Sequence, residues 1–192
     1  LSTGVALFLE IYAEKIFPFS LQGNIIGILF RSFIIISFCE ELVKWLFTYV
    51  ICWKDKNFNY VYDAIVYCVF ISLGFASIEN LIAILSNSGG FTLALQRGLI
   101  TVPAHAFFGI ISGYYLGLAK KYEARRWNKR KRKYIILSLL IPIIVHGMFD
   151  SLLFLSSTAS LLFATALIVY LYLSSALKVV KTSSEAKKIT RR

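Results

Sequence analysis

The sequence contains little charge and little cysteine. Asp, Glu, Lys and Arg make up only 16% of its 192 residues, whereas 58% are hydrophobic, and the mean hydropathy is +0.71. Cys39, Cys52 and Cys68 lie in apolar sequence and form no CxxC pair, which argues against a disulfide framework and against a thiolate zinc site. No internal repeat, low-complexity tract or cleavable signal peptide is visible. These absences leave a membrane protein as the class that the composition supports.

The sequence contains several long apolar runs. Each is near the ~20 residues that span ~30 Å of hydrocarbon, and helices are expected because open strands cannot satisfy their backbone in lipid. We predict an all-α fold: a polytopic membrane helix bundle with five to six transmembrane helices enclosing a polar cavity, in one domain over residues 1–192. The expected segments are Val5 to Phe17, Leu21 to Cys52, Tyr60 to Leu85, Phe91 to Ala119, Tyr134 to Leu155 and Ala159 to Val179.

Two of these segments have features of their own. Charged residues interrupt the first one, so within residues 1–20 a shortened, truncated span and an interfacial helix are both open interpretations. In the fourth, Pro103 is expected to kink the helix. Gly109, Gly113 and Gly117 recur at a spacing of four, which is typical of close packing between membrane helices.

Basic residues gather in two places. Of 21 Lys and Arg, nine lie in residues 120–133 and six in residues 178–192. Under the positive-inside rule we predict a cell-membrane, multi-pass protein with a cytoplasmic basic loop (120–133), a cytoplasmic C-terminal tail (180–192) and an extracytoplasmic turn at residues 86–90. Topogenic charge explains the net charge of +11 more simply than nucleic acid does, so no nucleic-acid partner is expected.

Ionisable residues interrupt four apolar segments. Glu40 and Glu41 form an adjacent pair between two long apolar runs. Charged groups inside a membrane are costly and mark functional sites by default. Six of these ionisable residues are candidate site residues, and they fall in the middle or outer half of the membrane if Arg31 and Arg97 snorkel to the outer interface. They are Glu40, Glu41, Glu79, His105, His146 and Asp150.

The spacing of these residues indicates chemistry. Glu40 and Lys44 are four residues apart, a favourable ion-pair spacing on a helix, whereas Glu41 is turned about 100° away. His146 and Asp150 have the same spacing, by which one helix face presents two metal ligands or a carboxylate that orients an imidazole. We predict that Glu40 or Glu41, Glu79, His146 and Asp150 converge on one cavity that His105 lines.

Several interpretations of this set remain open. The acids and imidazoles could hold a divalent metal that activates water, or a buried glutamate could act as general base without a metal. Structural alternatives are packing for His105, a Glu79 and Asn80 pairing with Arg97, and a hydrogen bond between His146 and Asp150. A non-enzymatic protein, either an ion or proton pathway or a scaffold subunit, also uses buried acids and histidines.

Four ordered motifs resemble the PrsW family of intramembrane proteases. The resemblance covers about residues 31–150, and four spaced motifs are more specific than any one. It implies an endopeptidase related to the CAAX prenyl endopeptidases, whose signature is also a double glutamate. The motifs are Glu40-Glu41-Leu42-Val43-Lys44-Trp45, Gly74-Phe75-Ala76-Ser77-Ile78-Glu79-Asn80, His105-Ala106-Phe107-Phe108-Gly109 and His146-Gly147-Met148-Phe149-Asp150.

The resemblance also implies roles. The substrate would be a single-span protein in the lipid bilayer, an anti-sigma factor, cut first on its extracytoplasmic side. We assign Glu40 as general base, with Glu41 and His146 also catalytic. Lys44, Asn80 and Arg97 would support the site or bind substrate, and a divalent metal, with zinc as the candidate, would be bound by Glu79, His105, His146 and Asp150. The prenyl endopeptidases carry histidine at the position of Glu79 and often asparagine at that of Asp150, so the ligands here could differ.

Overall fold

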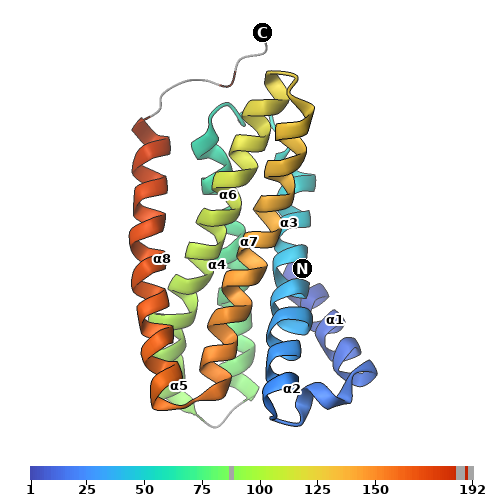
Figure 1. Ribbon diagram of the computed structural model, residues 1–192, viewed down its shortest axis with the longest axis vertical. Coiled ribbons are helices and arrows are strands. Elements are labelled where there is room, and N and C mark those ends of the chain that lie inside the picture. The colour runs from blue at the N-terminus through green and yellow to red at the C-terminus, as the bar shows by residue number, and fades with distance from the viewer. Residues whose placement is uncertain (87–88, 185–188, 190–192) are drawn as a thin grey trace.

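The structure is a computed structural model that describes residues 1–86, 89–184 and 189, and the regular elements of this part are all helical. The predicted all-α bundle is therefore confirmed (Figure 1). The elements are α1 (Ser2–Ile16), η1 (Pro18–Leu21), α2 (Ile25–Phe30), η2 (Arg31–Ser37), α3 (Phe38–Cys52), α4 (Val61–Ser86), α5 (Gly90–Gln96), η3 (Arg97–Thr101), α6 (Val102–Ala124), α7 (Asn128–Leu155) and α8 (Thr158–Ser184).

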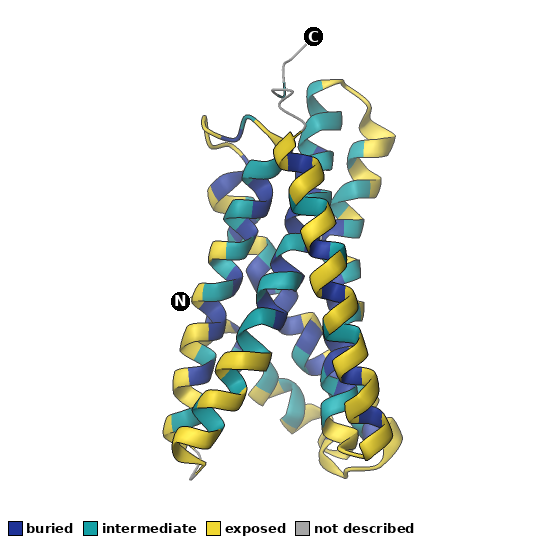
Figure 2. Cartoon of the chain, turned by 90° about the vertical axis from the view of Figure 1, so that its left-hand side faces the viewer, coloured by how far each residue is buried: buried dark blue, intermediate teal, exposed yellow. Residues whose placement is uncertain are grey.

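Four helical stretches are long and apolar enough to cross a membrane, which makes the chain a multi-pass membrane protein. They are Val61–Ser86, Gly90–Ala124, Asn128–Leu155 and Thr158–Ser184. A fifth stretch, from α2 through η2 to α3, runs beside them without a break (Figure 1). It carries more charged residues, namely Arg31, Glu40, Glu41 and Lys44. Large apolar side chains such as Phe70 and Leu85 are 72% and 77% exposed, and Figure 2 shows exposed residues along the outer faces of the helices, where lipid would cover them.

A π-helical stretch precedes the polar residues in two of the long helices. η2 comes before Glu40, and η3 comes before His105. Pro103 lies in the first turn of α6 and has no backbone N–H to donate, so the regular hydrogen-bond register changes just before it. Single π turns inside α-helices are frequent at functional sites.

Helix α1 is shorter than a span. Its 15 residues fall below the ~20 that cross hydrocarbon. Ala6 packs against Val43 of α3 and Phe75 of α4, and Glu14 binds Arg31 with 2.9 Å between Oε1 and Nε. The first segment is thus a short helix held against α3 and η2.

The predicted basic loop at residues 120–133 is mostly helical. Helix α6 continues to Ala124 and α7 begins at Asn128, because Lys and Arg are good helix formers and aromatic rings support them: Arg130 lies 4.6 Å above the Trp127 ring. Helix α8 likewise continues into the predicted tail as far as Ser184. The rest of that tail, except Ile189, and residues 87–88 of the predicted turn lie outside the described residues.

Glycines bring α6 against α4, as their spacing predicts. A Cβ atom on Gly113 would lie 2.5 Å from the Cα atom of Ile65, and one on Gly109 would lie 2.9 Å from Ser72 Oγ. The backbones approach closely only because these side chains are absent. This contact sets the distance between the helices that carry Glu79 and His105.

We expect Gly113→Ala to destabilise the protein by about 1 to 3 kcal/mol, because the new methyl group forces two packed backbones apart. Gly74→Ala is the matched control: it also lies in a helix, and nothing comes within 4 Å of its added Cβ. The free energy of unfolding in mixed micelles measures both. Equal effects of the two substitutions would contradict the close packing.

Candidate active site

One cavity gathers the predicted polar residues. It has a volume of about 140 Å³ and lies between α3, α4, η3, α6 and α7. The convergence predicted from the sequence is present, with His105 in the lining. The ionisable residues that line it are Glu40, Glu79, Arg97, His105, His146 and Asp150.

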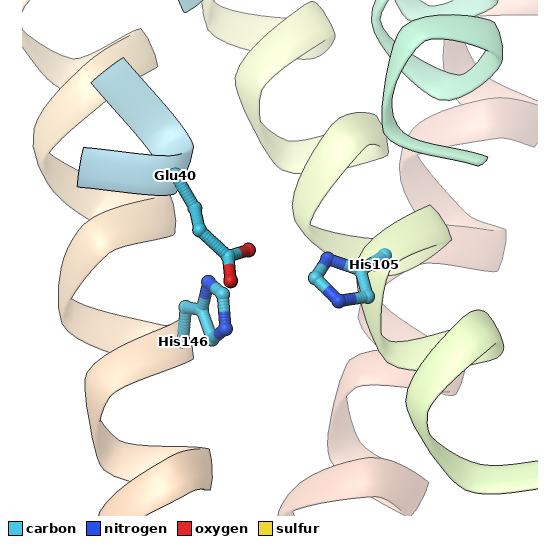
Figure 3. A group of neighbouring side chains, drawn as sticks. All are labelled: Glu40, His105 and His146. Atoms are coloured by element: carbon cyan, nitrogen blue, oxygen red, sulfur yellow. The ribbon is translucent and has the colours of Figure 1, made fainter. Parts of the chain in front are cut away.

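Three side chains form the centre of the site. Figure 3 shows Glu40, His105 and His146 pointing toward one another from three helices. One ligand atom of each lies within 4.8 Å of the others, and all three residues are buried. A carboxylate and two imidazoles are donors that zinc accepts.

Lys44 connects the glutamate pair to His105. Its Nζ atom lies 3.1 Å from Glu40 Oε2, 2.6 Å from Glu41 Oε1 and 3.0 Å from His105 Nδ1. The predicted pairing of Lys44 with Glu40 is confirmed, but the expectation that Glu41 turns away from Lys44 was wrong. The spacings of three and four residues both place a carboxylate beside Lys44, so one buried ammonium balances part of the charge of both.

His146 has an acidic partner at each ring nitrogen. Its Nδ1 atom lies 3.0 Å from Glu41 Oε1, and its Nε2 atom lies 3.3 Å from Asp150 Oδ2, one helical turn away. The Phe108 ring stacks on the imidazole with 4.7 Å between centroids. Glu41 thus stands behind His146, whereas Asp150 shares the cavity with it.

Glu79 faces both Arg97 and His105. Glu79 Oε1 lies 2.5 Å from Arg97 Nη2, and Oε2 lies 3.0 Å from His105 Nε2. Arg97 also donates from Nε to Asn80 Oδ1 at 2.8 Å. The expectation that Arg97 snorkels outward was wrong, because the partly buried carboxylate of Glu79 holds its guanidinium. The alternative, in which Arg97 pairs with Glu79 and Asn80, is what the structure contains.

Acids outnumber cations around the cavity, which suits a bound dication. Two ligands held at about 2.1 Å by one tetrahedral ion lie about 3.4 Å apart. His146 Nε2 and Asp150 Oδ2, at 3.3 Å, have this separation. The donor set therefore fits a divalent metal. The acids are Glu40, Glu41, Glu79 and Asp150, and the cations are Lys44 and Arg97.

Sequence reasoning missed Glu10, which it treated only as an interruption of the first segment. Glu10 lies within electrostatic range of Glu40, Glu79 and His146. Its Oε1 atom is buried and has no hydrogen-bond partner among the described residues. Thr3 and Ala6 are the buried residues of α1, so the spacing of three and four from Thr3 through Ala6 to Glu10 could have revealed an inward face.

A larger cavity of about 510 Å³ lies at the basic end of the bundle. It is lined by residues of the loop after α3 and by Lys120, Glu123 and Ala124 near the end of α6. Lys120 donates there to the backbone oxygen of Trp53 at 2.6 Å. Neither histidine reaches this cavity, so it lacks the donor set of the smaller one.

Comparisons with known proteins agree with the resemblance. The chain matches the family described as "PrsW family intramembrane metalloprotease" over residues 1–177. It is 40% identical over 139 residues to Protease PrsW of Halalkalibacterium halodurans, covering 72% of this chain and 61% of that protein. It is 33% identical over 164 residues to Protease PrsW of Clostridioides difficile, covering 84% and 68%.

A third relative is Protease PrsW of Bacillus subtilis, which is 37% identical over 127 residues, covering 66% of this chain and 56% of that protein. The match thus spans between about half and two thirds of these relatives. No solved structure matches the chain.

Proposed function

The chain belongs to the PrsW family of intramembrane metalloproteases, and we propose that it hydrolyses a peptide bond of a membrane-anchored protein. The observation that carries this proposal is the cavity that Glu40, His105, His146 and Asp150 line together. Separate helices place these costly groups together. A carboxylate base beside imidazoles and a donor set for a divalent metal are the parts that peptide hydrolysis needs.

The residues divide the work as follows. Glu40 accepts the proton of the attacking water and returns it to the leaving amine. His146 and Asp150 would hold the divalent metal, which when bound makes water a nucleophile at neutral pH and polarises the scissile carbonyl. Lys44 keeps the Glu40 carboxylate in place, and Glu41 orients the His146 ring.

We further propose that the substrate is a single-span membrane protein, an anti-sigma factor, cut on its extracytoplasmic side. The depth of the site supports this. His146 lies about 14 Å from the Leu155 end of α7 at 1.5 Å per residue, and the basic residues lie at the other end of that helix. A site nearer the less basic end is closer to the outer surface under the positive-inside rule.

The decisive test is cleavage in a reconstituted membrane. The purified protein and a candidate anti-sigma factor are placed in one liposome, and product is followed by gel and mass spectrometry. Appearance of a cut near the outer end of the substrate span supports the proposal. Proton or cation flux through the same liposomes, with no cleavage of any offered single-span protein, would favour the ion pathway instead.

Cysteine labelling tests the orientation. We expect Phe91→Cys to react with a membrane-impermeant maleimide from outside and Lys129→Cys to react only after lysis, because basic residues stay cytoplasmic. The native cysteines are all buried, and Phe91 is 81% exposed. Labelling of intact cells at Lys129→Cys, with protection at Phe91→Cys, would reverse the topology.

A further inference from the structure

We infer that, when the site holds its metal, the two imidazoles of the cavity carry their protons on opposite ring nitrogens, His105 on Nε2 and His146 on Nδ1. His146 then offers a lone pair to a metal, whereas His105 offers a hydrogen bond. The inference rests on the proposed function, because it assigns separate roles within that site. Its basis is the charge of the group behind each ring.

The first step concerns Lys44. An ammonium group has three N–H donors and no acceptor. Three atoms lie within hydrogen-bond distance of Nζ: Glu40 Oε2, Glu41 Oε1 and His105 Nδ1. Two carboxylates at 3.1 Å and 2.6 Å hold the lysine in its charged form. Nδ1 of His105 therefore accepts from Lys44, and its lone pair is occupied.

The second step follows from the chemistry of imidazole. A neutral ring has one protonated nitrogen and one with a lone pair. Since Nδ1 of His105 uses its lone pair, Nε2 carries the proton. Turning the ring over would place a C–H group against the Lys44 ammonium and give up this hydrogen bond. His105 in this arrangement has no lone pair left for a metal.

The Nε2–H group of His105 makes no well-aligned hydrogen bond to an acceptor among the described residues. Glu79 Oε2 lies 3.0 Å away, yet this oxygen is buried without a hydrogen bond of acceptable geometry among the described residues. The donor therefore remains available to the cavity that both residues line. A donor at this position can bind the carbonyl oxygen of a substrate as negative charge develops on it.

His146 has the opposite environment. The carboxylate of Glu41 is an acceptor only, so the atom 3.0 Å from it, His146 Nδ1, carries a proton. Asp150 Oδ2 lies 3.3 Å from Nε2, so in the metal-free protein Nε2 also carries a proton, which a bound metal replaces. Two acceptors this close repel unless a cation lies between them. A metal bound by both satisfies each, and the histidine with a carboxylate behind it is a common metal-site arrangement.

This assignment changes the ligand set expected from the sequence, which included His105. His146 and Asp150 hold the metal, Glu40 remains the general base, and His105 is a hydrogen-bond donor that touches the substrate. Lys44 and Glu41 are positioning residues, because each acts through the ring whose proton it places.

Nitrogen NMR tests the assignment directly. The chain contains only two histidines, so ring-labelled protein in micelles gives two imidazole signal sets, and a His105→Asn variant assigns them. In the Zn²⁺-loaded wild type we expect His105 protonated on Nε2 alone and His146 on Nδ1 alone. Addition of Zn²⁺ should shift the Nε2 signal of His146 and leave the Nδ1 signal of His105 hydrogen-bonded and unprotonated.

Metal affinity provides the second readout. Competition with a chromogenic chelator should show that His105→Asn changes the Zn²⁺ dissociation constant by less than about threefold, whereas His146→Asn weakens binding by about 100-fold or more. A proton on Nδ1 of His105 in the wild type, or equal loss of metal in the two variants, overturns the inference.

The two proposals fail separately. Correct tautomers in a protein that cleaves no substrate would remove the proteolytic function and leave the inference standing. A cleaving protein in which His105 binds the metal as tightly as His146 does would leave the function and remove the inference. Neither readout depends on turnover.

Discussion

The Glu40→Gln variant is expected to cleave its substrate about 10²- to 10⁴-fold more slowly, the range that a general base contributes. Glutamine keeps the shape of the side chain but cannot take a proton from water. The fold should survive, because Lys44 retains Glu41 at 2.6 Å and a neutral amide is easier to bury than a carboxylate. The measurement is the single-turnover rate of cleavage in liposomes with the reconstituted variant.

Two variants serve as controls. Glu123→Gln removes a carboxylate that pairs with Lys131 at 2.5 Å near the basic end, far along α6 from the cavity, and its rate should be unchanged. The metal content of Glu40→Gln separates a lost base from a lost ligand, since a base can be removed with the metal retained. A Glu40→Gln protein that cleaves at the wild-type rate would move the general base to another residue.

The positions of the helices and the set of polar residues could be predicted because each depends on local sequence. Apolar length predicted the stretches that begin with α4 and α5, and the four-residue spacing of Gly109, Gly113 and Gly117 predicted the close contact of α6 with α4. Lipid penalises every unpaired polar group, so charged residues within apolar runs had few places to go except a shared interior.

The partners of those residues could not be predicted, because pairing depends on which helices are neighbours. Lys44 reaches His105 across 61 positions of sequence, and Arg97 could be placed equally well at the interface or against Glu79. Glu10 was missed for the same reason: a carboxylate in a short, interrupted helix is typical of a solvated end until α1 is seen to pack on α3. Sequence therefore identified the acids and imidazoles but not the order in which they contact one another.

The Lys44→Met variant is expected to lose about 3 to 5 kcal/mol of unfolding free energy, which is typical when one partner of a buried ion pair is removed. Methionine has a similar length and fills the same space, so packing changes little. Among the described residues, Lys44 is the cation that pairs with Glu40, and it is one of two partners of Glu41, so the substitution removes both ion pairs. Equilibrium unfolding in mixed micelles, with helix content as the signal, gives the free energy.

Lys131→Met is the matched control, because its ion pair with Glu123 is partly exposed and such pairs contribute about 1 kcal/mol or less.

The double variant Lys44→Met with Glu40→Gln should lose less unfolding free energy than the sum of the two single losses, since removing the lysine costs most when the carboxylate remains. Additive losses would mean that Lys44 stabilises α3 through its aliphatic chain, for instance against the Phe75 ring 4.5 Å from Nζ. A coupled loss would instead mean that burying the two carboxylates costs stability and that the ammonium of Lys44 offsets this cost. Such a cost is expected at a site that is kept for its chemistry and not for its contribution to stability.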